Sequence, residues 1–169
     1  MKIMVASDIH GSIKHLDLLY NAFLKEEPNQ VIFLGDMFSY DNMDLLVEKL
    51  RMFYPTVFIR GNCDVYNLVS DSQLDFVSDY TFEAFHKKIF CSHGHIYDSN
   101  VYPDADFDVM IGGHTHIGKI DFKDNKYFLN PGSLSLPKGQ SVNSYMILDD
   151  EGIFLKDLNG TVIQSLQWK

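Results

Sequence analysis

Cysteine is scarce in this sequence, and no stretch is long and apolar enough to predict a membrane span. The 169 residues include two cysteines, Cys63 and Cys91, and no Cys-x-x-Cys motif. The two thiols could pair, but no signal-peptide pattern opens the sequence, which favours a reducing, cytoplasmic setting. The apolar runs fall far short of the about 20 residues that a transmembrane helix needs.

Positive charge is also scarce. Lysine and arginine number 14 against 23 aspartate and glutamate residues, which gives a formal net charge of -9. A nucleic-acid or anionic-membrane surface needs a basic footprint, so we expect neither as a partner. An acidic protein can still bind phosphate where bound cations reverse the local field.

The rest of the composition is that of an ordinary globular domain. Hydrophobic residues make up 46% of the chain and charged residues 22%, and a chain of this length can bury a proper core. No internal repeat or linker divides the sequence. We therefore expect one domain over residues 1–169.

Two patterns of secondary structure follow one another. The first part alternates strands, at 3–7, 30–34 and 56–60, with helices from Ser12 to Pro28 and over 42–52, which predicts parallel strands with ligands at their carboxyl ends. Beyond Tyr80 the pattern changes to hairpins, with strands at 80–85, 88–92, 117–122, 127–130, 144–148, 153–156 and 161–167. We expect an α/β fold in which two mixed β-sheets pack as a sandwich with flanking helices.

Five apolar runs end in residue types that bind metals. The ends are Asp8-Ile9-His10, Gly35-Asp36, Gly61-Asn62-Cys63-Asp64, His93-Gly94-His95 and His114-Thr115-His116. Each has an ordinary alternative: an aspartate can cap a helix, an asparagine can form a turn, and a histidine can lie in the core or on the surface. Together these alternatives do not explain a ligand type at every strand end.

Aspartate, asparagine and histidine suit mixed oxygen and nitrogen coordination of a divalent transition metal. The set exceeds what one ion needs, so we expect two ions about 3.5 to 4 Å apart that share one carboxylate. Such a pair lowers the pKa of a bridging water and clamps the attacking and leaving oxygens of a phosphoryl group. The pattern favours hydrolysis of a phosphate ester by in-line attack of the bridging hydroxide.

The ordered motifs resemble the calcineurin-like metallophosphoesterase superfamily. Among its members, the segments GNCD (61–64), SHGH (92–95), GGHTH (112–116) and Asn130-Pro131-Gly132-Ser133 resemble the small YfcE-type phosphodiesterases. The resemblance implies a four-layer α/β/β/α fold and a hydrolase of phosphoric esters. It also implies two divalent metal ions, with Mn²⁺ preferred and Fe²⁺, Zn²⁺, Co²⁺ or Ni²⁺ as alternatives.

The resemblance also assigns roles to individual residues. One metal would be bound by Asp8, His10 and His116, and the other by Asn62, His93 and His114, with Asp36 bridging both. Catalytic roles would fall on Asp36, Asn62 and His95, of which His95 would contact the substrate or assist the leaving oxygen. Asp64 would orient the Asn62 loop.

One position departs from the wider superfamily. Many members have a histidine directly after the motif asparagine, and this chain has Cys63, whose neutral thiol is a poor substitute for an imidazolium acid. Arg60 could contact phosphate in a bidentate manner, or it could cap its strand or form an ion pair. The only other arginine, Arg51, is predicted on a helix, so no clamp for a terminal phosphate is evident. We therefore expect a small phosphodiester or an activated aryl ester as substrate, with Arg60, Cys63 and His95 as candidate contacts.

Two other functions stay open at this point. A phosphomonoesterase acting on a small metabolite or nucleotide would use the same ligands. A noncatalytic interaction scaffold is the alternative of another class, since a retromer subunit resembles this fold but has lost part of the metal set. Here all seven ligand positions keep ligand residue types, which favours the enzyme. The acidic surface is compatible with a homodimer.

Overall fold

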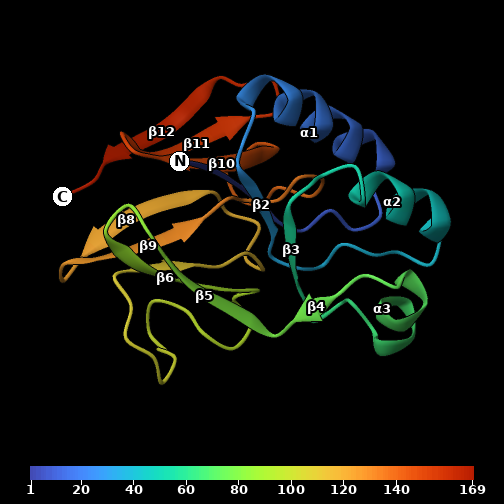
Figure 1. Ribbon diagram of the computed structural model, residues 1–169, viewed down its shortest axis with the longest axis horizontal. Helices are drawn as coiled ribbons and strands as arrows, with labels where there is room; N and C mark the ends of the chain where they lie inside the picture. Colours follow the sequence, from blue (N-terminus) through green and yellow to red (C-terminus); the bar gives the residue numbers. More distant parts are fainter.

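The chain folds into two β-sheets that pack face to face, with three helices outside the larger sheet (Figure 1). This computed structural model describes all 169 residues. Its elements, in order, are β1 (Lys2–Ala6), α1 (Ile13–Glu26), β2 (Gln30–Phe33), α2 (Met43–Leu50), β3 (Thr56–Ile59), α3 (Tyr66–Ser72), β4 (Phe76–Val77), β5 (Asp79–Ala84), β6 (Lys87–Ser92), β7 (Val109–Ile111), β8 (Lys119–Lys123), β9 (Lys126–Asn130), β10 (Ser144–Asp149), β11 (Gly152–Asp157) and β12 (Val162–Gln167).

Both sheets are mixed. The larger sheet has the order β12-β11-β10-β1-β2-β3-β4, and the smaller has the order β5-β6-β7-β9-β8. Strands β1 to β4 are parallel, as are β6, β7 and β9, while hairpins supply the antiparallel strands. The loops after the parallel strands meet at one edge, where the Asp8 N–H donates to the Gly35 carbonyl at 3.0 Å and the Gly113 N–H donates to the His93 carbonyl at 2.8 Å.

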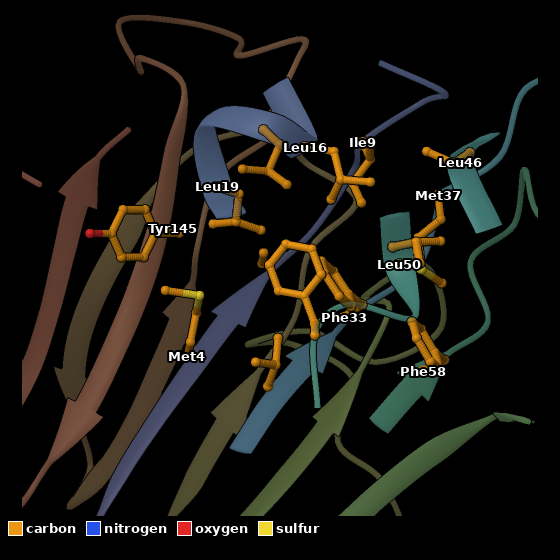
Figure 2. Close-up of a cluster of buried hydrophobic side chains, with 14 of the residues drawn as sticks. Met4, Ile9, Leu16, Leu19, Phe33, Met37, Leu46, Leu50, Phe58 and Tyr145 are labelled. Atoms are coloured by element: carbon orange, nitrogen blue, oxygen red, sulfur yellow. The ribbon is translucent and has the colours of Figure 1, made fainter. Parts of the chain in front are cut away.

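The alternation of side chains along each strand produces two cores. In β1, Met4 and Ala6 face the helices, whereas Ile3 and Val5 face the second sheet, because successive side chains point to opposite sides of a strand. Figure 2 shows Met4 in the first core, with α1 and α2 packed over the strands. With both faces covered, the parallel strands hold their carboxyl ends in fixed positions.

The predicted fold class is confirmed: two mixed sheets form a sandwich with helices outside. The outer layer of the smaller sheet, however, is the irregular segment 93–108. Phe107 and Tyr97 of this segment pack on Phe90, Met110 and Phe128. Asp98 accepts the N–H groups of Asn100 and Val101 in a turn, and Pro103 has no backbone N–H to donate, so the segment covers the sheet as a loop.

Two short elements, α3 and β4, were absent from the sequence-based prediction. Helix α3 has seven residues and buries only Leu68 and Ser72, so its apolar periodicity is too brief to stand out. Strand β4 has two residues and owes its position to pairing with β3, where Phe76 lies opposite Phe58. None of the helices is long and apolar enough to cross a membrane.

Candidate metal centre

Three side chains form the first group of candidate ligands, at the ends of β1 and β7. The Nε2 atom of His116 lies 3.1 Å from Asp8 Oδ1 and 3.3 Å from the Nε2 atom of His10. Asp8 and His116 are buried, and their ligand atoms and that of His10 all lie within 4.8 Å of one another. This is the set that the resemblance to the superfamily assigned to one metal.

A second group lies beside the first, at the ends of β2, β3, β6 and β7. Ligand atoms of Asp36, His93 and His114 lie within 4.8 Å of one another. The side-chain oxygen of Asn62 is 3.0 Å from His93 Nε2, so the amide joins the same group. The structure thus brings together all seven residues of the predicted ligand set.

Asp36 lies between the two groups. Its Oδ2 atom is 3.8 Å from His10 Nε2 in the first group and 3.4 Å from His93 Nε2 in the second. Its Oδ1 atom accepts the Cys63 backbone N–H at 2.8 Å, which fixes the orientation of the carboxylate. One oxygen is therefore anchored by the chain, and the other faces both groups, as a shared ligand requires.

The donor atoms fit a cation. Asp8 Oδ1 is buried and has no hydrogen-bond partner, which is costly for a carboxylate unless a cation neutralises it. His93 and His116 are close enough to donate their Nδ1–H groups to the carbonyls of Leu34, at 2.8 Å, and Leu136, at 2.7 Å. That arrangement directs each Nε2 into the donor cluster, where it could bind an ion, as in many metal sites.

The backbone at the site is unusual. Five of the seven residues have positive φ: Asp8 at 56°, His10 at 46°, Asp36 at 52°, His114 at 62° and His116 at 63°. Left-handed backbone costs on the order of 1 to 2 kcal/mol at a non-glycine residue and persists only where its surroundings enforce it. These turns bend the chain sharply after each strand, which brings ligand side chains from separate loops into one cluster.

Asp64 holds two of the ligand loops together. Its buried carboxylate accepts four backbone N–H groups, from Asp36 at 2.8 Å, Met37 at 2.8 Å, Phe38 at 3.1 Å and Gly61 at 2.9 Å. The predicted role was to orient the Asn62 loop. The contacts extend that role to the Asp36 turn, because one side chain bridges the ends of β2 and β3.

Glycine is required before Asn62 because the two loops approach closely. A Cβ atom at Gly61 would lie 2.2 Å from Asp36 Oδ1 and 2.3 Å from the Asp36 nitrogen. Any side chain there would displace the shared carboxylate. The Gly-Asn pair in the sequence therefore reflects a packing constraint of the site.

The Asn130–Ser133 segment supports the site from β9, as the sequence suggested. Asn130 donates to the Gly113 carbonyl at 2.7 Å and to Thr115 Oγ1 at 3.0 Å, which braces the histidine loop. Ser133 donates to the Asp8 carbonyl at 2.8 Å. Ser135, which sequence reasoning missed, donates to the Ile9 carbonyl at 2.8 Å. Such a serine carries no recognisable signal, because it acts through a backbone atom.

The three candidate substrate contacts differ in position. His95 is exposed, with its ring centroid 5.3 Å from that of His93 and 6.1 Å from that of His114. Arg60 donates from Nε to the Asp64 carbonyl at 3.1 Å, so it closes its own loop. Cys63 is exposed beside Asn62, whose side-chain amide donates to Sγ at 3.4 Å.

The environment sets the charge states of these groups. Burial alone would raise the pKa of Asp36, but the hydrogen bonds from His93 and Cys63 and the charge of His93 hold that pKa well below its usual range. Burial, followed by the effects of Asp36, raises the pKa of Cys63 to about 11. Burial and the charges of His93 and His114 lower the pKa of His95. At neutral pH the site therefore presents a carboxylate, a neutral thiol and a neutral imidazole.

Comparison with known proteins identifies the class to which this fold and this donor set belong. A family model described as the calcineurin-like phosphoesterase superfamily domain matches residues 1–152. The chain belongs to that superfamily. The prediction of a hydrolase acting on phosphoric esters is confirmed at this level.

Within the superfamily, the chain is similar to phosphodiesterase YfcE of Escherichia coli strain K12, with 29% identity over 94% of this chain and 93% of the relative. The solved structure of that phosphoesterase has a TM-score of 0.90, with 26% identity and full coverage of both chains. Vps29 of Entamoeba histolytica, solved as a complex with Zn²⁺, shares the fold, with a TM-score of 0.71 at 21% identity over both whole chains.

The contacts of Asp64 yield a testable prediction. Replacing Asp64 with asparagine turns one acceptor oxygen into an NH₂ group that faces backbone donors. We expect the free energy of unfolding to fall by about 3 kcal/mol, because buried donors are left unpaired. Urea denaturation measures this loss. The exposed Asp104→Asn exchange is the matched control and should change stability by less than about 0.5 kcal/mol; equal effects of the two exchanges would contradict the anchoring role.

Proposed function

We propose that this protein is a phosphodiesterase that uses two divalent transition-metal ions, with Mn²⁺ preferred, to hydrolyse small phosphodiesters. The position of Asp36 carries the proposal: one carboxylate oxygen faces His10 and His93, which belong to different donor groups. Bound metal ions would activate water as the nucleophile and stabilise charge on the phosphoryl oxygens.

The side chains of the site would bind the two ions, keep the ligands in place and contact the substrate. Asp8, His10 and His116 would hold one ion, Asn62, His93 and His114 the other, and Asp36 would fix the spacing between the two. Asp64 and the serines behind Asp8 keep these side chains in place before substrate arrives, which is the preorganisation that catalysis requires. His95, exposed beside His93 and His114, is positioned to contact the phosphoryl group or the leaving oxygen.

The groups around the site favour diesters over monoesters. At the position of the superfamily's histidine stands Cys63, whose raised pKa leaves a neutral thiol, and the lowered pKa of His95 leaves little imidazolium. A basic leaving oxygen would therefore receive little help from a proton donor. The Nε–H of Arg60 donates to the Asp64 carbonyl, which holds the arginine against its own loop. Hydrolysis of phosphomonoesters is the alternative.

Three predictions from the sequence are kept as predictions: a cytoplasmic setting, a small phosphoester as the partner in place of nucleic acid or a membrane, and a homodimer. A noncatalytic scaffold is less well supported than an enzyme, because each of the seven side chains has a donor type and reaches the cluster.

Metal dependence tests the enzyme assignment. Protein loaded with Mn²⁺ should hydrolyse bis-p-nitrophenyl phosphate, and removal of metal by a chelator should abolish turnover until Mn²⁺ is restored. Asp36→Asn should lower kcat/KM by about 10³-fold or more and reduce the bound metal, because the shared ligand is weakened. The exposed Asp41→Asn exchange is the control. Full turnover and metal content in Asp36→Asn would refute the assignment.

The role of Cys63 in substrate preference can be tested separately. We expect Cys63→His to increase turnover of p-nitrophenyl phosphate relative to bis-p-nitrophenyl phosphate by about tenfold or more, because an imidazolium adds a positive charge beside the dianionic monoester, whereas the diester is a monoanion. The comparison of the two kcat/KM values before and after substitution measures this shift. An unchanged preference would remove Cys63 from the argument, and a faster monoester reaction in the unmodified protein would favour the phosphomonoesterase.

A further inference from the structure

A cleft lies between the outer face of the smaller sheet and the segment 93–108 that covers this face (Figure 1). The resemblance to the superfamily implied a layer of helix here. The segment is a loop instead, and it leaves a cavity of about 280 Å³. Ligand pockets in proteins usually measure about 300 to 1,000 Å³. The cleft is at the lower end of that range, which suits one small, flat ring.

The floor and one wall of the cleft are apolar or aromatic. Met110 of β7 and Phe128 of β9 form the floor, and Tyr97 of the covering segment forms the wall. Tyr97 is held in place by an edge-to-face contact with Phe90, in which the ring centroids are 5.6 Å apart. Side chains of this kind favour a planar ring as occupant, because aromatic groups stack on one another or meet edge to face.

One end of the cleft lies at the histidine loops of the donor cluster. Gly94 lines the cleft and directly follows the ligand His93. Thr115 lines it as well and directly follows the ligand His114. Since glycine has no side chain, nothing at position 94 closes this end. A phosphoryl group at the donor cluster would therefore lie beside the mouth of the cleft.

The charged groups at the cleft indicate the charge of its occupant. The Asp98 Oδ1 atom accepts the N–H groups of Asn100 at 2.7 Å and Val101 at 2.9 Å, which fixes this carboxylate in the lining. Lys119, the one cation of the lining, is paired with Asp121 at 2.6 Å. The cleft thus offers a fixed negative charge and a positive charge that is already balanced. A second phosphate or a carboxylate would be repelled, so a neutral ring fits best.

The geometry of phosphoryl transfer decides which part of a diester reaches the cleft. In-line attack places the leaving oxygen opposite the attacking oxygen, so the ester group that stays on phosphorus projects sideways from that line. The donor cluster lies at the edge where the two sheets meet, and the cleft lies to its side, on the outer face of the smaller sheet. The retained ester group is the part that points toward such a lateral cleft.

We propose that the cleft binds the retained ester group of the phosphodiester and selects substrates in which this group carries a neutral aromatic ring, of the size of phenyl or one nucleobase. The inference rests on the proposed function, because it assigns the substrate class of the same site. Tyr97 determines specificity by its contact with the ring. No bond forms or breaks in the cleft, and the ring leaves with the monoester product.

Binding in the cleft can be measured without turnover. Metal-free, full-length protein is labelled with carbon-13 at the methionine methyl groups and titrated with phenol, and Met110→Leu identifies the Met110 signal. Ring currents should shift the Met110 signal until it saturates, while the signal of Met146, from the core between the sheets, stays in place. Tyr97→Ala should weaken phenol binding by about fivefold, because an aromatic contact is lost. Tyr102→Ala is the matched control, since Tyr102 is on the same segment but does not line the cleft, and it should change binding by less than about twofold.

Two diesters with the same leaving group test the selection of substrate. For Mn²⁺-loaded protein, phenyl p-nitrophenyl phosphate should have a KM about tenfold or more below that of methyl p-nitrophenyl phosphate at a similar kcat. The reason is that a retained ring is bound equally in the ground state and the transition state. Tyr97→Ala should raise the KM of the phenyl ester by about fivefold and change that of the methyl ester by less than about twofold. Tyr102→Ala should leave both values within about twofold.

The outcomes separate this inference from the proposed function. Equal KM values for the two diesters, or equal effects of Tyr97→Ala and Tyr102→Ala, would overturn the role of the cleft while the phosphodiesterase stands. A Met110 signal that saturating phenol does not shift would overturn the cleft as a binding site, whatever the turnover. Phenol binding without turnover of either diester would refute the proposed function, and with it the part of the cleft in substrate choice.

Discussion

The structure depends on placing three buried aspartates at one edge of a β-sandwich. Asp8, Asp36 and Asp64 each lose their hydration there, and buried carboxylates must be compensated by donors or cations. Asp64 accepts four backbone N–H groups on its two oxygens. Asp8 and Asp36 are compensated on one oxygen only, by the N–H groups of His114 and Cys63. The other oxygen of each faces imidazole nitrogens, and this imbalance suits the edge to hold metal ions.

The fold supplies what such a site needs. Parallel strands β1, β2, β3, β6 and β7 end close together, and a ligand follows within three residues of the end of each strand. Glycine before Asn62 allows two loops to touch, and left-handed turns redirect five of the seven side chains. Each of these features costs stability on its own. The hydrophobic cores on both sides of the larger sheet supply the folding free energy that offsets these costs and keeps the turns and close contacts in place.

Much of this arrangement could be predicted from the sequence. The apolar runs predicted most strands and the first two helices, and the ligand types at their ends predicted one assembled site, because strand ends in such sheets converge. The choice of the seven ligands among these residues came from the resemblance to the superfamily. The pattern could not reveal α3, β4 or the loop over the smaller sheet, since tertiary packing decides those. Nor could it reveal the carbonyls of Leu34 and Leu136, which orient histidines through backbone atoms of any residue type.

The position of Cys63 also required the structure. The sequence places a thiol beside the motif asparagine, but only the fold shows that Sγ lies near His10, a residue from a different loop.

The measurement that tests the central claim most directly is a crystal structure of the Mn²⁺-loaded protein with anomalous scattering at the manganese edge. The account predicts two peaks about 3.5 to 4 Å apart with an Asp36 oxygen between them, one beside Asp8, His10 and His116 and the other beside Asn62, His93 and His114. A single peak, or two peaks that do not share Asp36, would contradict it.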